Sequence, residues 1–204
     1  MLAIIDYDIG NLASVLNMLK RISVNCCITK EASEIMTATH IILPGNGSFD
    51  ACMKGLRATG LIPLLEERVI RNNVPLLGIC VGAQMLGHKS EEGIEPGLGW
   101  LNIQVDQFPS LPGLRIPHMG WNHVKVAQAT HPLMREISAD SRFYFTHSFY
   151  LNAKIPEDVL LHSHYGIEFA AAVAQRNIVG VQFHPEKSHR YGKQLLSAFA
   201  NWLP

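Results

Sequence analysis

The first half of the chain alternates short apolar runs with segments of helical periodicity, and this alternation restricts the fold more than any other feature. Four runs are typical of buried strands, at Leu2–Asp6, Val24–Ile28, His40–Leu43 and Val74–Ile79. Apolar residues at helical spacing occupy the intervals, at Leu12–Ile22, Phe49–Leu56, Leu61–Arg71 and Ala83–His88. This order predicts a parallel sheet with right-handed crossovers, and a site at the carboxyl ends of its strands.

The second half changes character, because short alternating strands replace the strand–helix order. They are predicted at Leu101–Val105, Asn122–Val126, Phe143–Thr146, Val159–Tyr165, Glu168–Ala174 and Ile178–Gln182, with a closing helix at Arg190–Trp202. No internal repeat, low-complexity tract or linker separates the halves. We therefore expect one domain over residues 1–204: a three-layer α/β fold, flavodoxin-like, whose mostly parallel sheet has helices on both faces and gains an antiparallel extension in the second half.

Charge and composition restrict the partners. The chain has 17 Lys plus Arg and 17 Asp plus Glu, and no basic run, so nucleic acid is not expected to bind. The N-terminal residues lack the basic and apolar regions of a signal peptide, and no apolar stretch approaches bilayer length. We expect a cytoplasmic protein without membrane contact, whose four cysteines stay reduced.

Cys80 is the candidate nucleophile. It follows the strand Val74–Ile79, precedes the helical segment from Ala83, and lies between Gly78 and Gly82. A sharp strand-to-helix turn needs such small residues two positions before and after the exposed side chain. A helix N-terminus also favours the thiolate that attacks a carbonyl carbon. Cys26, Cys27 and Cys52 lie in ordinary strand or helix patterns and are interpreted as structural.

A base and its orienting carboxylate are predicted in His184 and Glu186, which follow the strand Ile178–Gln182. Carboxyl ends of parallel strands share one edge, so this places His184 beside Cys80. A histidine can take the thiol proton and return it to leaving ammonia, while Glu186 orients the ring. On its own, the motif could be a surface loop.

Backbone donors for an oxyanion are expected in the turn Gly45, Asn46, Gly47, which ends another strand, and at the N–H of Val81. No dinucleotide or Walker motif accompanies this turn, so a phosphate loop is not indicated. His162 and His164 share a strand face, but two ligands without an acidic partner do not predict a metal site. No metal and no cofactor is expected.

These motifs carry a family resemblance. Gly78-Ile79-Cys80-Val81-Gly82-Ala83-Gln84 and Phe183-His184-Pro185-Glu186 resemble the class I, triad-type glutamine amidotransferases. Three further segments are similar to the glutaminase subunits of imidazole glycerol phosphate synthases in histidine biosynthesis. They are Asp6-Tyr7 with Gly10-Asn11, Pro117–Asn122, and His184–Ser188.

The resemblance implies that Cys80 attacks the side-chain amide of L-glutamine, and that ammonia passes to a (β/α)8-barrel cyclase in a heterodimer making imidazole glycerol phosphate and AICAR. By position, it implies substrate-binding roles for Gln84, Glu92, His147, Ser148 and Phe149. It also implies that Asn11, Ser14, Tyr144 and Lys187 face the partner or the ammonia passage.

Two residues depart from the family pattern. Asn46 replaces a commonly apolar residue at the oxyanion turn, and His189 replaces a smaller residue near the expected interface. They motivate an alternative, a paralogous ammonia donor for amidated surface sugars. A non-enzymatic regulatory subunit is a third hypothesis, which predicts a missing triad member. From the residues alone, His118–Asn122 is interpreted as a packed loop with Trp121 buried.

Overall fold

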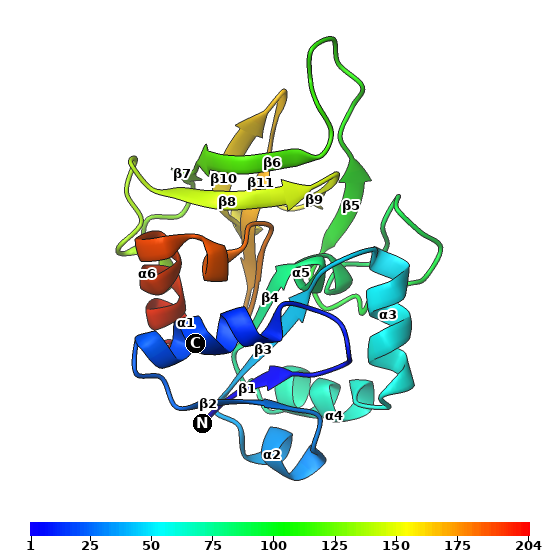
Figure 1. Ribbon diagram of the computed structural model, residues 1–204, viewed down its shortest axis with the longest axis vertical. Coiled ribbons are helices and arrows are strands. Elements are labelled where there is room, and N and C mark those ends of the chain that lie inside the picture. The colour runs from blue at the N-terminus through cyan, green and yellow to red at the C-terminus, as the bar shows by residue number, and fades with distance from the viewer.

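The computed structural model describes residues 1–204 and places its main sheet between two groups of helices (Figure 1). The strands are β1 Leu2–Ile5, β2 Cys26–Thr29, β3 His40–Gly45, β4 Leu76–Cys80, β5 Ile103–Gln107, β6 His118–His123, β7 Lys125–Val126, β8 Arg142–His147, β9 Phe149–Ala153, β10 Val159–Tyr165, β11 Ile167–Gln175 and β12 Ile178–Val181. The helices are α1 Leu12–Arg21, α2 Ala32–Thr37, α3 Phe49–Ala58, α4 Ile62–Glu66, α5 Val81–Met85 and α6 His189–Ala200. Short 3₁₀ turns occur at Pro132–Met134, Pro156–Asp158 and Pro185–Lys187.

The parallel part of the sheet has the strand order β2-β1-β3-β4-β12. Strands β1, β3, β4 and β12 are buried along their whole length, as continuous apolar runs in a sheet covered on both faces should be. The register sets Gly45 at the end of β3 opposite Cys80 at the end of β4. The predicted nucleophile and the predicted oxyanion turn therefore leave neighbouring strands at the same edge.

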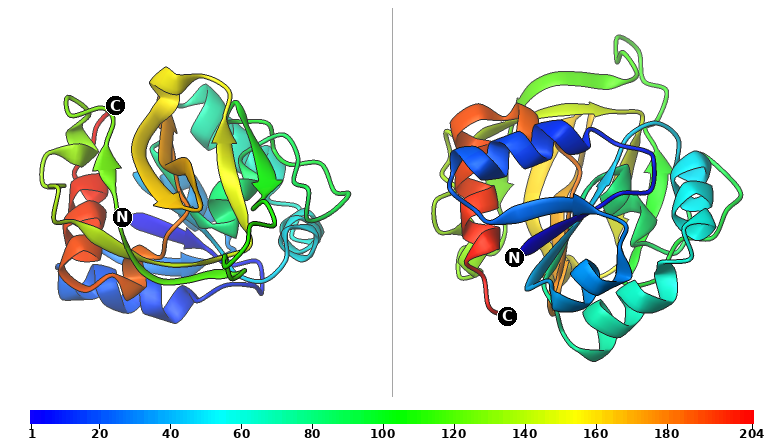
Figure 2. Two further views of the ribbon diagram at one scale, coloured as in Figure 1. Left: turned by 90° about the horizontal axis from the view of Figure 1, so that it is seen from above. Right: turned by 60° about the horizontal axis from the view of Figure 1, so that its bottom comes forward.

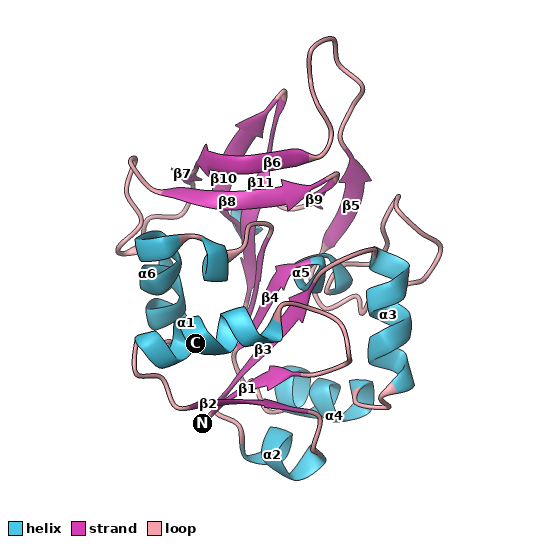
Figure 3. Cartoon of the chain, in the orientation of Figure 1, coloured by secondary structure: helices cyan, strands magenta, loops and turns pink.

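Strand β12 joins the two halves of the sheet. It pairs in parallel with β4, through Gly180 with Gly78, and antiparallel with β11, through Val181 with Ala172. The hairpin β10–β11 continues the sheet, β9 branches from β11, and β5 pairs with β9. Strands β6 and β8 pair as a separate ribbon that lies in front of the β10–β11 hairpin in the view of Figure 3. The expected mostly parallel sheet with an antiparallel extension is confirmed.

Helices cover both faces of the parallel strands. Helices α1 and α6 lie together on one side, while α3 and α4 lie on the other, as the right view of Figure 2 shows. Helix α1 turns Val15, Met18 and Leu19 into the core and carries Lys20 and Arg21 in its last turn, where they complement the helix dipole. A contiguous cluster of buried apolar side chains extends through both halves of the chain.

The structure corrects several local predictions. The segment His118–Asn122 is not a packed loop but forms most of β6. Trp121 is not buried, because 42% of its surface is exposed. The segment is polar, contains Gly120 and buries only His118, so its sequence lacks the apolar alternation that predicts a half-buried strand. Strand β9 and helix α2 were not predicted. The predicted helix over Leu61–Arg71 is α4 followed by a π-turn at Glu67–Arg71. None of the helices has the length and apolarity needed to cross a bilayer.

Candidate active site

Cys80 occupies a strained turn between β4 and α5. Its φ and ψ are 54° and −114°, a region that side-chain-bearing residues rarely adopt. The two flanking glycines make the turn sterically possible. A Cβ at Gly78 would lie 2.7 Å from the Cα of Ala83, and one at Gly82 would lie 2.0 Å from the carbonyl oxygen of Leu43. The sequence therefore folds into the predicted elbow. Close backbone packing around the turn holds Cys80 in its strained conformation.

His184 and Glu186 form a buried hydrogen-bonded pair. His184 Nδ1 lies 2.8 Å from Glu186 Oε1, and both side chains are almost wholly buried. The pair follows β12 in the Pro185–Lys187 turn. Ser188 braces this turn, because its hydroxyl donates to the carbonyl of His184 at 2.6 Å and accepts the N–H of Tyr144 at 2.9 Å. With Nδ1 occupied by the carboxylate, Nε2 is left without a hydrogen-bond partner.

The surroundings of His184 favour its protonated form. Burial lowers the pKa of this imidazole, but the neighbouring Cys80 thiol and the Glu186 carboxylate outweigh burial and raise the pKa to about 9. The free Nε2 and the nearby sulphur are the arrangement needed for proton exchange between a cysteine and a histidine. The structure therefore brings together the three residues predicted from the sequence to form the triad.

A cavity of about 260 Å³ opens over Cys80. Its walls include all five residues for which a substrate-binding role was expected, together with three from the expected oxyanion group. The lining residues are Asn46, Gly47, Cys80, Val81, Gln84, Glu92, Pro117, Thr146, His147, Ser148 and Phe149. Gly45 lies behind this wall, where a Cβ would come within 2.2 Å of the backbone nitrogen of Gly82. A hollow of about 430 Å³ near α6 is larger, but it contains no cysteine, histidine or other nucleophile–base pair.

Comparison with known proteins agrees with this geometry. The family model described as "Glutamine amidotransferase class-I" matches residues 3–201. Two relatives named as the HisH subunit of imidazole glycerol phosphate synthase are similar over nearly the whole chain. HisH 2 of Pseudomonas aeruginosa is 49% identical over 98% of both chains, and HisH of Bdellovibrio bacteriovorus is 46% identical over 98% of this chain and 99% of its own.

The chain belongs to the class-I glutamine amidotransferases, among the HisH subunits of imidazole glycerol phosphate synthase. The predicted family is thus confirmed, and the subunit class with it. Among solved structures, PurLQS from Thermotoga maritima superposes with a TM-score of 0.77 at 19% identity, covering 100% of this chain and 98% of the matched one. At that identity the likeness supports the amidotransferase fold alone.

The oxyanion turn of this amidotransferase is held from behind. The thiol of Cys52, in α3, donates to the carbonyl of Asn46 at 3.4 Å, and the hydroxyl of Tyr7 donates to the carbonyl of Pro44. Cys52 is fully buried, as expected for a structural cysteine. These contacts orient the peptides that precede and follow the expected oxyanion donor.

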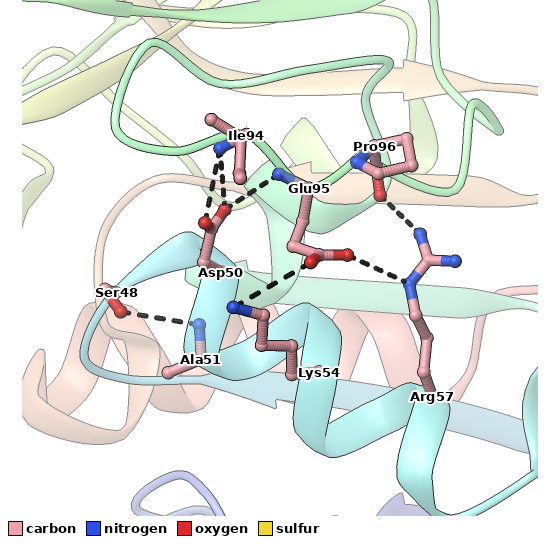
Figure 4. A network of polar contacts seen from close by, with 8 residues as sticks. All are labelled: Ser48, Asp50, Ala51, Lys54, Arg57, Ile94, Glu95 and Pro96. Atoms are coloured by element: carbon pink, nitrogen blue, oxygen red, sulfur yellow. Dashed lines mark hydrogen bonds and ion pairs between the residues drawn. The ribbon is translucent and has the colours of Figure 1, made fainter.

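A polar network fastens the Glu92 loop, residues 92–96, to helix α3 (Figure 4). Asp50 accepts the N–H groups of Ile94 and Glu95, at 3.1 and 3.0 Å. These bonds, chiefly that from Glu95, lower the pKa of Asp50. Glu95 in turn pairs with Lys54 and Arg57, and Arg57 donates to the carbonyl of Pro96 at 2.7 Å.

Glu92 itself contacts α3, because its carboxylate accepts the N–H of Phe49 at 2.8 Å. Helix α3 begins directly after the oxyanion turn, with Ser48 as its N-cap. One helix terminus therefore positions both the oxyanion turn and a wall of the substrate cavity.

The residues expected to face the partner lie around the Pro185–Lys187 turn. Lys187 Nζ lies 5.8 Å above the ring of Tyr144, and α1, with Asn11 at its N-cap and Ser14 in its first turn, packs against the Pro185–Lys187 turn. His189 stacks on Trp121 with ring centroids 5.5 Å apart. His162 Nδ1 lies 3.7 Å from Glu168 Oε1, and the structure has no cluster of three or more side chains that could hold a metal ion.

The sequence analysis did not identify Gln182, a fully buried residue that follows the last residue of β12. It contacts both Gln84 and Cys80. Its only sequence signal was its place immediately before the Phe183–Glu186 motif.

Proposed function

We propose that this chain is the glutaminase subunit of an imidazole glycerol phosphate synthase, hydrolysing L-glutamine to L-glutamate and ammonia for histidine biosynthesis. The observation that carries the proposal is Cys80 on its strained elbow, beside the His184–Glu186 pair and open to the cavity. All three residues of a cysteine triad are present, which argues against a non-enzymatic regulatory subunit.

In this mechanism the Cys80 thiolate attacks the side-chain amide carbon of glutamine. His184 gives its Nε2 proton to the leaving ammonia and then accepts one from the water that hydrolyses the thioester. Glu186 fixes the ring through Nδ1 and stabilises its charged form. The N–H of Val81 and a peptide of the Gly45–Gly47 turn stabilise the oxyanion.

Substrate binding falls to the cavity walls. Gln84 and Glu92 both line the cavity, and the segment His147, Ser148, Phe149 supplies backbone groups for the α-amino and carboxylate ends of glutamine. The whole chain, residues 1–204, acts as one domain in this proposal.

The partner is a (β/α)8-barrel cyclase, bound as a heterodimer. In this proposal Asn11, Ser14, Tyr144 and Lys187 contact the cyclase and border the ammonia passage. The enzyme is cytoplasmic and binds neither nucleic acid nor membrane, as its balanced charge led us to expect. Because a free glutaminase would waste glutamine, we expect low activity alone and stimulation by the partner carrying its own ligand.

The test is Cys80→Ala and His184→Ala, each assayed with the cyclase. Both should abolish glutamine-dependent formation of imidazole glycerol phosphate and leave ammonia-dependent formation unchanged. Cys27→Ala is the matched control, since this half-buried thiol lies on β2, far along the sheet from the elbow. Glutamine-dependent turnover that survives in both triad variants would contradict the proposal.

A second candidate keeps the same glutaminase chemistry and delivers ammonia to the synthesis of an amidated surface sugar. Two departures from the family pattern favour it: Asn46 in the cavity wall, and His189, which stacks on Trp121 beside Tyr144. Mixing the chain with a histidine-pathway cyclase separates the two. Tight binding without imidazole glycerol phosphate would favour the second acceptor.

A further inference from the structure

We propose that Gln182 is a positioning residue, whose side-chain amide orients Gln84 and the Cys80 sulphur together and thereby makes the site selective for a carboxamide substrate. This inference rests on the proposed glutaminase function and deepens it. Gln182 follows β12 directly, and 0% of its surface is exposed.

Both ends of the Gln182 amide are in use. Its Oε1 accepts from Gln84 Nε2 at 3.1 Å, and its Nε2 donates to Cys80 Sγ at 3.9 Å. Its backbone N–H is fixed separately, to the carbonyl of Ala171 at 2.9 Å. A buried polar side chain with both ends paired is held in one orientation.

The backbone carbonyl of Phe149 determines which atoms of Gln84 and Gln182 donate and which accept. The carbonyl of Phe149 can only accept, and Gln84 Nε2 lies 3.2 Å from it. The Gln84 amide must therefore turn its nitrogen toward Phe149 and Gln182. Gln182 must then turn its oxygen toward Gln84, which leaves its N–H for the sulphur.

A pair of buried histidines also holds the carbonyl of Phe149. His147 Nδ1 donates to the carbonyl of Phe149 at 2.7 Å, so its Nε2 must accept from His118 Nδ1 at 2.9 Å. His118 Nε2 then accepts from Asn122 Nδ2 at 3.2 Å. Burial lowers the pKa of His118 to about 4 and of His147 to about 3, so both rings are neutral and can hold these tautomers.

The consequence for the substrate lies at Gln84 Oε1. Both N–H groups of Gln84 are used by the protein, while no protein group donates to Oε1 on this cavity-lining residue. An acceptor in the cavity favours a substrate amide, which can donate, over an ester or carboxylate, which cannot. The N–H of Gln182 also stabilises the Cys80 thiolate.

The first test measures alkylation of Cys80 by iodoacetamide against pH, in the isolated full-length chain, with peptide mass spectrometry to separate the four cysteines. Gln182→Met removes both hydrogen bonds, and in this variant the pH midpoint of Cys80 alkylation should rise by about half a pH unit or more. Gln182→Glu replaces the donor by a carboxylate, and its midpoint should rise by about one unit or more. Gln175→Met and Gln175→Glu are matched controls at the far end of the β11–β12 hairpin, and should match the wild type.

The second test compares kcat/KM for L-glutamine and for L-glutamate γ-methyl ester in the complex with the cyclase. Gln182→Met should reduce the preference for the amide about tenfold, since the acceptor at Gln84 is no longer held. Wild-type midpoints and wild-type selectivity in Gln182→Met would overturn the inference, even if Gln182→Glu failed to fold. A wild-type chain without glutaminase activity would instead contradict the proposed function, and the alkylation result would still decide the role of Gln182.

Discussion

At the scale of single residues, the site depends on charged groups placed where water is excluded. A buried imidazolium is costly unless a carboxylate pairs with it, and Glu186 supplies that carboxylate at 2.8 Å. The same contact fixes which ring nitrogen faces the sulphur. Glu186 thus fixes the orientation of His184 and, together with Cys80, favours its charged form, which makes Glu186 the residue to change.

We expect Glu186→Gln to lower the pKa of His184 from about 9 toward the ordinary value of 6.5, because the amide no longer stabilises the charged ring while burial still opposes it. Nuclear magnetic resonance titration of the imidazole measures the midpoint. Glu168→Gln is the matched control, since it removes the carboxylate beside His162 and should leave His184 unchanged. An unchanged His184 midpoint in Glu186→Gln would show that the pair does not set its charge.

At the scale of elements, the turn after β3 and the elbow after β4 pack backbone against backbone. Glycine is required at Gly82 because a Cβ there would lie 2.0 Å from the carbonyl oxygen of Leu43. No side-chain rearrangement relieves a clash of this kind. The two turns that build the site therefore depend on each other's position.

Gly82→Ala should lower the free energy of unfolding by more than about 3 kcal/mol, because it forces two backbone segments apart. Gly60→Ala is the control. Gly60 has φ of 69° but open space around its Cα, so alanine there should cost only about 1–2 kcal/mol in backbone strain. Urea unfolding followed by circular dichroism measures both. Equal losses in the two variants would contradict the close-packing argument.

The Glu92 loop should loosen when its clamp is removed. Asp50→Ala deletes the acceptor of the Ile94 and Glu95 N–H groups, so we expect faster hydrogen exchange at both and a severalfold higher KM for glutamine. Asp50→Asn keeps one acceptor oxygen and should show a smaller effect. Glu66→Ala, an exposed acidic residue on α4, controls for the lost charge. Wild-type exchange at Ile94 in Asp50→Ala would refute the clamp.

How far the elements could be predicted depended on how local their signals are. Strand–helix alternation and the period of the apolar residues sufficed for the parallel half, and the flanking glycines sufficed for the elbow. Helix α2 is too short to show periodicity, and β9 is separated from β8 by a single residue, Ser148, so both were missed. Gln182 and His118 could not be recognised, because their partners Gln84 and His147 reach them only through pairing of distant strands.

At the scale of the whole molecule, buried histidines contribute to the way stability depends on pH. The unfolded chain binds a proton at each histidine near pH 6.5. The fold keeps His118 and His147 neutral down to about pH 4 and 3, and keeps His184 protonated up to about pH 9. Buried neutral histidines therefore make the fold less stable as the pH falls, and a stabilised imidazolium makes it less stable as the pH rises.

We therefore expect stability to be greatest near pH 6.5 and to fall on both sides. Below this pH the unfolded state takes up protons that His118 and His147 do not bind in the fold, and burial also lowers the pKa of His40 and of His131. The acid side should therefore reach a slope of at least two protons. Above it the unfolded state releases the proton that His184 retains, so stability should fall with a slope of about one proton. Burial raises the pKa of Cys26, Cys27 and Cys52, so the fall should steepen as the pH nears 9.

Urea unfolding from pH 4.5 to 9 measures this profile, and variants assign its two sides. His118→Gln should reduce the acid slope by about one proton, whereas His184→Gln should flatten the alkaline side and leave the acid side steep. His123→Gln, an exposed substitution on the same strand as His118, should keep the wild-type profile. Stability that continued to rise between pH 6.5 and 9 would contradict the raised pKa of His184, because a group that holds its proton more tightly in the folded state must lose stabilisation as protons become scarce.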